Sequence, residues 1–305
     1  MIRRFLSVPV ASVLVLCGAA VLPVLATPSY AAQFGMAQAA KFTATQESET
    51  AHTVGKPLRV STDNGSIKVT KGSGDKVRVT AKLRATTQER LDATKVTTVR
   101  NADGSLTVSV TWPGNDRKSS EGCDLEVSIP DVSAVTATTS NGSITAKGLS
   151  GAATLGTSNG SIGVDAWEGD LKADTSNGSI EANAVTGKVD AKSSNGRVKA
   201  TDVQGPVTID TSNASVDVSL KGKAPGPVRI HTNNGGVHLR VGPAFAGKLH
   251  AETSNGTISV KGAHAKAVGK PARDEGTWQF GQGGADSEVE TDNGGVTVEV
   301  VESGD

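Results

Sequence analysis

The sequence predicts an all-β protein, a parallel β-solenoid, and three observations lead to this fold class. Glycine recurs at every ninth position from Gly142 to Gly205. Apolar residues stand two and four places after each of these glycines, which is the period-two pattern of a short strand. The turn Ser-Asn-Gly returns every 18 residues, as at 140–142 and 158–160. A short period kept over most of a chain is typical of a solenoid, and we expect coils of about 18 residues with two short strands each.

Residues 1–31 precede the repeats and are predicted to be a secretory signal peptide. Arg3 and Arg4 begin it, residues 5–25 are almost all apolar or small, and Ser29-Tyr30-Ala31 has small residues where a signal peptidase reads them. We expect cleavage after Ala31. A membrane anchor is the alternative, but prolines interrupt the run, whereas a span needs about 20 unbroken apolar residues. We therefore expect no transmembrane span after signal cleavage.

The two cysteines have different expected roles. Cys17 lies inside the apolar run, where a lipoprotein signal carries its lipidated cysteine. Leu16 before it is larger than the small residue of such signals, so a lipid anchor at Cys17 is the alternative to secretion. Cys123 would be the one cysteine of the mature chain, which leaves no internal disulfide. It alternates with the apolar residues Leu125 and Val127, which predicts an inward side chain.

Composition limits the classes of partner. The chain has 31 Lys and Arg residues and 31 Asp and Glu residues, and loss of Arg3 and Arg4 leaves 29 basic residues against 31 acidic ones. Nucleic-acid binding needs a strong positive excess, so no nucleic-acid partner is expected. Aromatic residues make up only 3% of the chain while small residues dominate, which predicts many short strands around a thin core.

The regularity of the pattern divides the chain into segments. The repeats are most regular at 131–260, the coils before about residue 130 are less regular, and residues 261–305 hold a Gly- and charge-rich insertion and a last strand pair, TDNGGVTVEVV. The predicted segments are a signal peptide at 1–31, a flexible leader at 32–56, the solenoid domain at 57–300 and a C-terminal tail at 301–305.

An antiparallel meander is the rival arrangement, because Asn-Gly between two strands is also a strong hairpin signal. The outward-facing positions favour the solenoid. Read at steps of 18 and then 21 residues, their charges alternate or nearly so, as opposite charges on stacked strands should. The columns are Asp174, Lys192, Asp210, His231 and Glu252; Lys172, Asp190, Thr208, Arg229 and His250; and Glu181, Lys199, Asp217 and His238.

Each Ser-Asn-Gly is interpreted as a corner of the solenoid. Glycine is expected there because it adopts backbone conformations that other residues avoid, and asparagine because it tolerates the left-handed region. Stacked asparagines could also form an amide ladder along the edge. An alternative use of this edge of serine, asparagine and threonine is contact with glycans.

The tandem units resemble a bacterial family of exported β-strand repeat proteins, the "putative adhesin" family, which is a domain of unknown function. The matching stretches are LRVSTDNGSIKV from Leu58, the run from SIPDVSAVTATTSNGSITA to TSNASVDV, and TSNGTISV from Thr253. They cover most of the mature chain and are specific for architecture, not for activity. The resemblance implies a right-handed single-stranded β-helix with a surface-associated or adhesive role, and it supplies no catalytic residues.

The best local group of chemistry-bearing side chains comprises Asp210, Arg229, His231, His250 and Glu252. If the columns hold, Asp210, His231 and Glu252 lie in one line on strands about 4.8 Å apart. Two imidazoles and two carboxylates could bind zinc. A solvated charge ladder that fixes the register is the alternative, and it is preferred. The turns lack the paired aspartates of calcium-binding repeats, so no metal or cofactor is expected.

These observations favour an exported, non-enzymatic module that acts as an adhesin-like binder or scaffold at the cell surface or outside the cell. The expected partners are cell-wall or extracellular polysaccharide, or a surface protein. The alternatives are a polysaccharide-acting β-helix enzyme and a metal-binding surface module. An enzyme would need aromatic residues that stack on sugars, and the chain has three tryptophans. Trp112 is expected in the core, Trp167 in a corner column, and Trp278 as a plug near the last coil.

Overall fold

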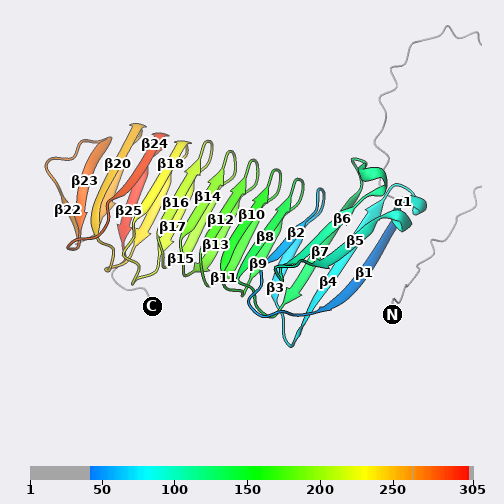
Figure 1. Cartoon of the computed structure of the whole chain (residues 1–305). Helices are drawn as coiled ribbons and strands as arrows, with labels where there is room; N and C mark the ends of the chain where they lie inside the picture. Colours follow the sequence, from blue (N-terminus) through cyan, green and yellow to red (C-terminus); the bar gives the residue numbers. More distant parts are fainter. Residues whose placement is uncertain (1–41, 263, 302–305) are drawn as a thin grey trace, which may run out of the picture. The chain divides into compact units, whose positions relative to one another are not determined.

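The computed structural model describes residues 42–262 and 264–301, which belong to one compact unit, Ala39–Asp305. The predicted signal peptide with Cys17, and the predicted leader before residue 42, lie outside the described residues. The described chain is all-β (Figure 1), with a short α-helix, α1 (Gln88–Ala93), and a 3-10 helix at Pro113–Asn115. No helix in this part of the chain has the length and apolar character that a membrane crossing requires.

The strands form two sheets, and parallel pairing dominates both. Sheet A has 12 strands, in spatial order β1 (Phe42–Ala51), β4 (Lys76–Ala85), β7 (Gly122–Ile129), β3 (Ile67–Lys71), β9 (Ile144–Lys147), β11 (Ile162–Trp167), β13 (Ile180–Val185), β15 (Val198–Val203), β17 (Val216–Leu220), β19 (Val237–Val241), β25 (Val296–Val300) and β21 (Ile258–Lys261). Sheet B has 13, in spatial order β22 (Ala265–Ala267), β23 (Glu275–Phe280), β20 (Gly247–Asn255), β24 (Ser287–Asn293), β18 (Val228–Asn234), β16 (Val207–Thr211), β14 (Val189–Ser193), β12 (Leu171–Thr175), β10 (Ala152–Thr157), β8 (Ala134–Thr139), β2 (Leu58–Ser61), β6 (Leu106–Thr111) and β5 (Lys95–Arg100).

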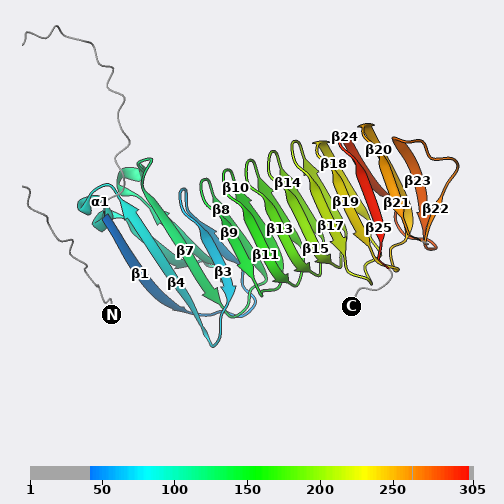
Figure 2. The same ribbon diagram turned by 180° about the vertical axis from the view of Figure 1, so that it is seen from behind.

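The regular array, β8 to β17, has the parallel arrangement that the repeat predicted. Its strands alternate between the two sheets, and one strand of sheet B with the next strand of sheet A makes one coil (Figure 2). Neighbouring strands of a sheet place opposite each other residues that are 18 apart in sequence, as Ala153 and Leu171 are. The step becomes 21 residues between β16 and β18, where Val207 is opposite Val228. The meander alternative is therefore wrong for this array.

The core is a thin layer of small and medium apolar side chains between the sheets. Both predicted inward columns are buried throughout the array, and Val198 and Val207 are each only 1% exposed. Trp112 is buried, as predicted. Cys123 is also buried and unpaired, and burial raises the pKa of its thiol to about 12. This cysteine therefore packs as a small apolar residue and stays protonated at neutral pH.

The Ser-Asn-Gly corners need glycine for a reason that differs from the expected one. Gly160 and Gly178 do not adopt the left-handed region, but a Cβ on Gly178 would collide with the carbonyl oxygen of Gly160. Successive coils thus approach too closely for a side chain at this position. Ala214 interrupts the glycine series, and there the hydrogen bond from Val198 N to Ser215 O lengthens to 3.3 Å, against 2.9–3.0 Å at the adjoining corners.

The alternate corners bury an apolar side chain instead. Trp167 is fully buried, as the corner column predicted, and its Nε1 donates a hydrogen bond to Gly151 O at 2.8 Å. Val185 and Val203 occupy the same position in the next two coils and are also fully buried. Each of the three follows a residue with the left-handed φ of 53°, namely Ala166, Ala184 or Asp202. Burial of the following side chain offsets the cost of that backbone, about 1–2 kcal/mol for a non-glycine residue.

The N-terminal end of the described unit departs from sequence order. The coil β2/β3 lies between β6/β7 and β8/β9, and all four pairings are parallel. β4 and β1 then extend sheet A, and β5 extends sheet B, by antiparallel pairing. The expectation of a flexible leader at 32–56 is wrong for residues 42–51, because they form β1 opposite the whole of β4. Their polar sequence hid the strand, since an edge strand without a buried face needs no apolar alternation.

The C-terminal end departs from sequence order in the same way. The coil β24/β25 lies between β18/β19 and β20/β21, again with four parallel pairings. β23 and β22 extend sheet B beyond β20 by antiparallel pairing. Trp278 and Phe280 on β23 are buried, and the Phe280 ring meets Phe245 edge to face at 5.2 Å between centroids. The aromatic residues of the antiparallel extension therefore pack inward, with Phe280 against Phe245 of the segment before β20.

Candidate binding surface

The predicted group lies on the outer face of sheet B, but in a different order along that face. Asp210 is opposite His231, as predicted. Glu290 of β24 then stands between His231 and Glu252. The prediction that His231 and Glu252 occupy neighbouring strands is therefore wrong, because an inserted coil separates them. His231 instead pairs with the inserted residue, with 3.3 Å between its Nδ1 and Oε2 of Glu290.

Arg229 and His250 are separated in the same way, by Glu288. His250 Nδ1 lies 3.2 Å from Oγ1 of Thr277 on β23, and its Nε2 lies 3.8 Å from Oε2 of Glu252. Among residues 42–262 and 264–301, no three His, Cys, Asp or Glu side chains are arranged to hold a metal ion. The predicted residues are thus members of a charge ladder, and their geometry gives the zinc alternative no support.

A second charged group, on the outer face of sheet A, includes partners that the sequence columns missed. Arg197 Nε donates to Asp217 Oδ2 at 2.8 Å. His238 Nε2 lies 3.3 Å, and Arg240 Nε 3.6 Å, from Oε2 of Glu299 on β25. The His238 imidazole lowers the pKa of Glu299. Arg197, Asp217 and His238 line a shallow, open groove of about 420 Å³.

An asparagine ladder runs along the Ser-Asn-Gly edge. Each side-chain Nδ2 donates to the Oδ1 of the asparagine in the preceding coil, at 2.8 to 3.0 Å. The ladder passes through the inserted coil without a break. Its members, in spatial order, are Asn141, Asn159, Asn177, Asn195, Asn213, Asn234, Asn293 and Asn255. The predicted amide ladder is confirmed, and it is exposed to solvent along its length.

A buried hydroxyl ladder accompanies the asparagines two residues earlier in each turn except that of Asn213, where the buried Thr211 hydroxyl has no hydrogen-bond partner among the residues that the structure describes. Each hydroxyl donates to the corner carbonyl of the neighbouring coil at 2.8 to 3.1 Å, so that these polar side chains are satisfied inside the edge. Its members are Thr139, Thr157, Thr175, Ser193, Thr232, Thr253 and Thr291. The threonine or serine that begins each TSNG turn therefore holds the corner to the neighbouring coil, whereas the asparagine side chain lies at the surface.

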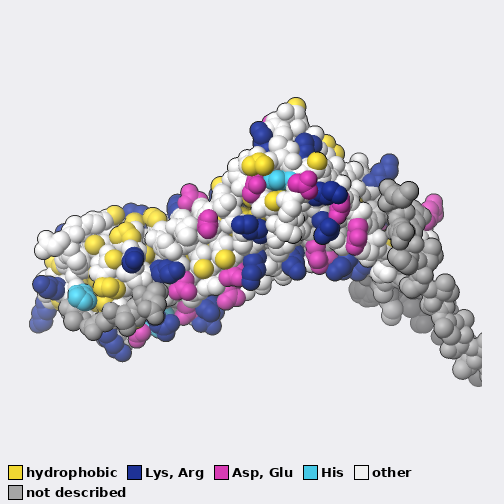
Figure 3. Space-filling model, turned by 90° about the horizontal axis from the view of Figure 1, so that it is seen from below, with side chains coloured by type: hydrophobic (Ala, Val, Ile, Leu, Met, Phe, Trp, Pro, Cys, Tyr) yellow, Lys and Arg dark blue, Asp and Glu magenta, His cyan; other side chains and the backbone are white. Residues whose placement is uncertain are grey.

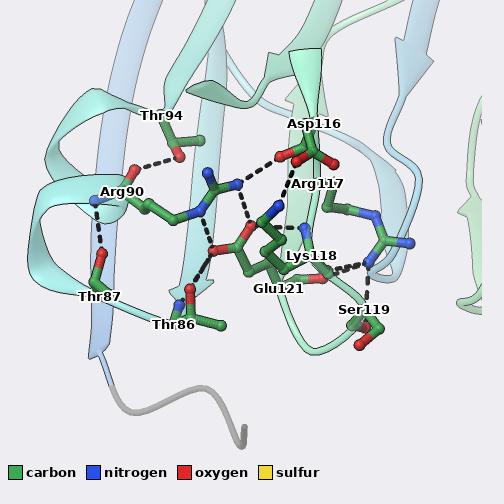
Figure 4. Close-up of polar contacts among 9 residues, drawn as sticks. All are labelled: Thr86, Thr87, Arg90, Thr94, Asp116, Arg117, Lys118, Ser119 and Glu121. Carbon is green, nitrogen blue, oxygen red and sulfur yellow. Dashed lines mark hydrogen bonds and ion pairs between the residues drawn. The ribbon is translucent and has the colours of Figure 1, made fainter. Parts of the chain in front are cut away.

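A buried ion pair that the sequence analysis missed organises the N-terminal end (Figure 4). The Glu121 side chain is fully buried and accepts two hydrogen bonds from Arg90 of α1, both at 2.7 Å. It also accepts from Thr86 Oγ1 and Lys118 N. Burial alone would raise the pKa of Glu121, but these hydrogen bonds outweigh it and lower the pKa to about 2. The pair joins α1 to the loop before β7, which gives it a structural role.

The outer surface is suited to repeated polar contacts. Positive and negative side chains are interspersed on the face that Figure 3 shows, without a large region of one sign. Neighbouring strands repeat every ~4.8 Å, so amides and charged groups recur at a fixed spacing along each column. Such a surface can hydrogen-bond an extended polymer at many equivalent points. The outward-facing columns of charged residues could be read from the sequence. Glu288, Glu290 and Glu299 could be placed in them only once the inserted coil was known.

Comparisons with known proteins give a family and distant structural likenesses. No curated protein sequence matches the chain. A "putative cell adhesion protein" from Clostridium sporogenes is 11% identical, with 84% of this chain and 100% of that chain covered and a TM-score of 0.29. A "putative adhesin" from Bacteroides fragilis is 10% identical, with 84% and 97% covered and a TM-score of 0.35. A "putative lipid binding protein" from Parabacteroides distasonis is 10% identical, with 85% and 97% covered and a TM-score of 0.36. The Toastrack DUF4097 model matches residues 33–279, and the chain therefore belongs to that family.

Proposed function

We propose that this protein is an exported, non-enzymatic, adhesin-like module that binds or scaffolds at the cell surface or in the extracellular space. The predicted signal peptide, with cleavage after Ala31, supports export, and lipid attachment at Cys17 is the alternative route to the surface. We further propose that its coils of about 18 residues wind in the right-handed sense that parallel crossovers strongly favour. The proposed partners are cell-wall or extracellular polysaccharide, or a surface protein.

One observation carries this proposal: the exposed polar side chains stand in registered rows along both sheets and the asparagine edge. A row of equivalent amides offers a polymer many weak contacts, and linked weak contacts together give strong binding. The asparagine ladder leaves donor and acceptor positions open to solvent, because each amide has two N–H donors and an oxygen with two lone pairs. The edge therefore fits a neutral, hydroxyl-rich polymer better than a charged one.

Cosedimentation tests the proposal. The full mature chain is mixed with the producer's cell wall and with a panel of insoluble polysaccharides, and soluble sugars are assayed in the same tubes. We expect saturable binding without released sugar. Release of sugar would favour the polysaccharide-acting enzyme, and a failure to bind any of these polymers would contradict the polysaccharide proposal and leave a surface protein as the proposed partner.

Matched variants locate the contact. Asn159→Ala, Asn177→Ala and Asn195→Ala together remove three neighbouring amides from the edge, and we expect a loss of binding of tenfold or more. Lys172→Ala with Asp190→Ala removes a charge pair from the face of sheet B and serves as the control, with binding expected to change less than twofold. The reverse pattern would place the contact on the sheet face.

A further inference from the structure

The inserted coil β24/β25 differs in charge from the two coils that enclose it. Residues 287–301 contain four acidic residues and no basic one: Glu288, Glu290, Asp292 and Glu299. The enclosing strands carry mostly basic side chains and histidines on their outer faces: Arg229, His231, His238, Arg240, Lys248, His250 and Lys261, with Glu252 as the acidic exception. We call β24/β25 the arm, and the space between β18/β19 and β20/β21 the slot.

The slot is complementary in charge to the arm at Glu299 in sheet A and at Glu288 in sheet B. In sheet A, Glu299 is opposite Arg240 on one side and Lys261 on the other. In sheet B, Glu288 is flanked in the same way by Arg229 and His250, whereas Glu290 is opposite His231 on one side and the like-charged Glu252 on the other. If the arm were absent and the walls of the slot met, Arg240 would face Lys261, and like charges directly opposite each other are destabilising. At these positions the basic walls of the slot therefore favour an acidic coil between them over direct contact with each other.

Backbone and amide contacts add to this selection. Val237 N donates to Gly295 O at 2.9 Å on one wall, and Val296 N donates to Thr257 O at 3.0 Å on the other. The arm also supplies one rung of the asparagine ladder, Asn293. The apolar side chains of the arm, Val289, Val296 and Val298, are fully buried. All of these contacts depend on the sequence of the arm, and none depends on which chain carries it.

The segment that precedes the arm has the properties of a hinge. Residues 281–286, GQGGAD, are exposed along their whole length. Gly281, Gly283 and Gly284 have left-handed φ values of 54°, 68° and 88°, which only glycine adopts at little cost. A short glycine-rich connection can redirect the arm without loss of the arm's own contacts. Exchange of such an element between identical chains is a low-cost route to dimers.

We propose that the slot accepts the arm of a second copy of this chain, so that two copies exchange arms and form a dimer. The contacts of the exchanged dimer are those of the monomer, made twice between chains. The tethered arm competes with an effective concentration in the millimolar range, so exchange is favoured where copies are concentrated. This inference goes beyond the proposed function, because the partner here is the chain itself.

Charge reversal in separate copies tests the exchange. An arm-reversed chain carries Glu288→Lys and Glu299→Lys, and a slot-reversed chain carries Arg229→Glu, Arg240→Glu and Lys261→Glu. In each chain alone the arm and the slot repel. In a mixture, exchange matches both arms to the slots of the other chain. A chain with all five substitutions matches its own arm, and its thermal unfolding shows whether the substitutions permit folding.

Native mass spectrometry identifies the dimers, because the two chains differ in mass. At low protein concentration we expect a one-to-one heterodimer in the mixture, at least tenfold more abundant than the homodimers of either chain alone. The chain with all five substitutions matches its own arm, as the wild-type chain does, so both should be mainly monomeric at that concentration and form dimers as the concentration rises. A mixture that stays monomeric overturns the proposal. So does dimerisation of the five-substitution chain to the same extent as the mixture.

A second pair of chains separates exchange from simple attraction between oppositely charged proteins. It places the same changes in net charge within the regular array, with Asp174→Lys and Glu181→Lys in one chain and Lys172→Glu, Lys192→Glu and Lys199→Glu in the other. No arm reaches these positions, so no heterodimer is expected. A heterodimer of equal abundance from this pair would show attraction without exchange and would overturn the proposal.

Discussion

The regular array and the two ends differ in how the stacking order of their coils relates to the sequence order. In the array each coil is stacked on the coil that precedes it in sequence, whereas at each end one coil is inserted out of order. A solenoid stacked only in sequence order can lose its terminal coils one at a time, because each coil contacts only its neighbours. Here β2/β3 and β24/β25 have a coil on both sides, so neither can detach without the loss of two interfaces. The array thus provides repetition, and at each end the inserted coil is held between two other coils.

A buried charge in the array should have the largest effect. Val207→Asp places a carboxylate in the thin apolar layer between the sheets, where Val207 is 1% exposed. Burial of an unpaired charge costs more than about 4 kcal/mol, a large share of a typical domain's stability. We expect loss of the cooperative thermal transition by circular dichroism. Thr208→Asp, the next residue and outward-facing, is the control, and a melting curve of Val207→Asp close to wild type would contradict the inward column.

Removal of the buried carboxylate at the N-terminal end should have a large effect confined to that end. Glu121→Gln leaves Arg90 without its charged partner, and a broken buried pair costs about 3–5 kcal/mol. We expect hydrogen exchange to accelerate in residues 86–121 while the array stays protected. Glu181→Gln, which removes an exposed pair with Lys199, is the control, with an effect of about 0–1 kcal/mol. Equal acceleration in the array would show that the end is not a separate unit.

The lowered pKa of the Glu121 carboxylate predicts that the stability of the N-terminal end depends on pH. This pKa is about 2 in the folded chain and 4.5 as the reference value. Because the folded value is the lower one, the stabilisation is fully present above pH 4.5 and is lost as the pH falls from there towards about 2. The stability of the N-terminal end should therefore fall as the pH decreases through this window, and Glu121→Gln should remove that part of the pH dependence. An unchanged profile in the variant would assign the acid sensitivity to other groups.

A matched pair of corner substitutions should have intermediate, opposite effects within the array. Gly178→Ala places a Cβ against the carbonyl oxygen of Gly160, and forced repacking of this kind costs about 1–3 kcal/mol. Ala214→Gly should let the neighbouring coils approach more closely and shorten the 3.3 Å hydrogen bond from Val198 N to Ser215 O. We expect a smaller gain in stability than the loss caused by Gly178→Ala. Denaturant unfolding measures both free energies. Destabilisation by both substitutions would show that the Ala214 corner has its own relaxed geometry.

A charge substitution on the outer face should have the smallest effect. Lys192 lies between Asp174 and Asp210 in the array, so Lys192→Asp creates two like-charge neighbours. We expect a loss of about 0.5–1 kcal/mol at low salt that shrinks as salt screens the surface. Lys192→Ser removes the charge without reversing it and is the control. Its free energy of unfolding should lie between those of the wild type and Lys192→Asp. A loss that does not depend on salt would have to come from packing.

The sequence predicted the array better than the ends, and the reason is physical. The inward columns, the parallel register and the asparagine ladder all repeat with the period of the chain, so one coil predicts the next. The place of Glu290 between His231 and Glu252 depends on a strand that lies 59 residues beyond His231 in the sequence, and no local period contains that information. Strand β1 and the Arg90–Glu121 pair were missed because a polar edge strand and a buried ion pair have no repeating signature.

The asparagine ladder also has a consequence for the chemical ageing of the protein. Seven of its eight members are followed by glycine, the sequence in which the backbone nitrogen most readily attacks the asparagine side chain, with release of ammonia. In the folded ladder each amide is held by its neighbour, and the attacking nitrogens of Gly178 and Gly196 are engaged by Thr175 and Ser193. Conversion to aspartate would replace an N–H donor with an acceptor and break the rung. The stacked coils therefore protect covalent bonds as well as a fold, and an unfolded chain would age faster than a folded one.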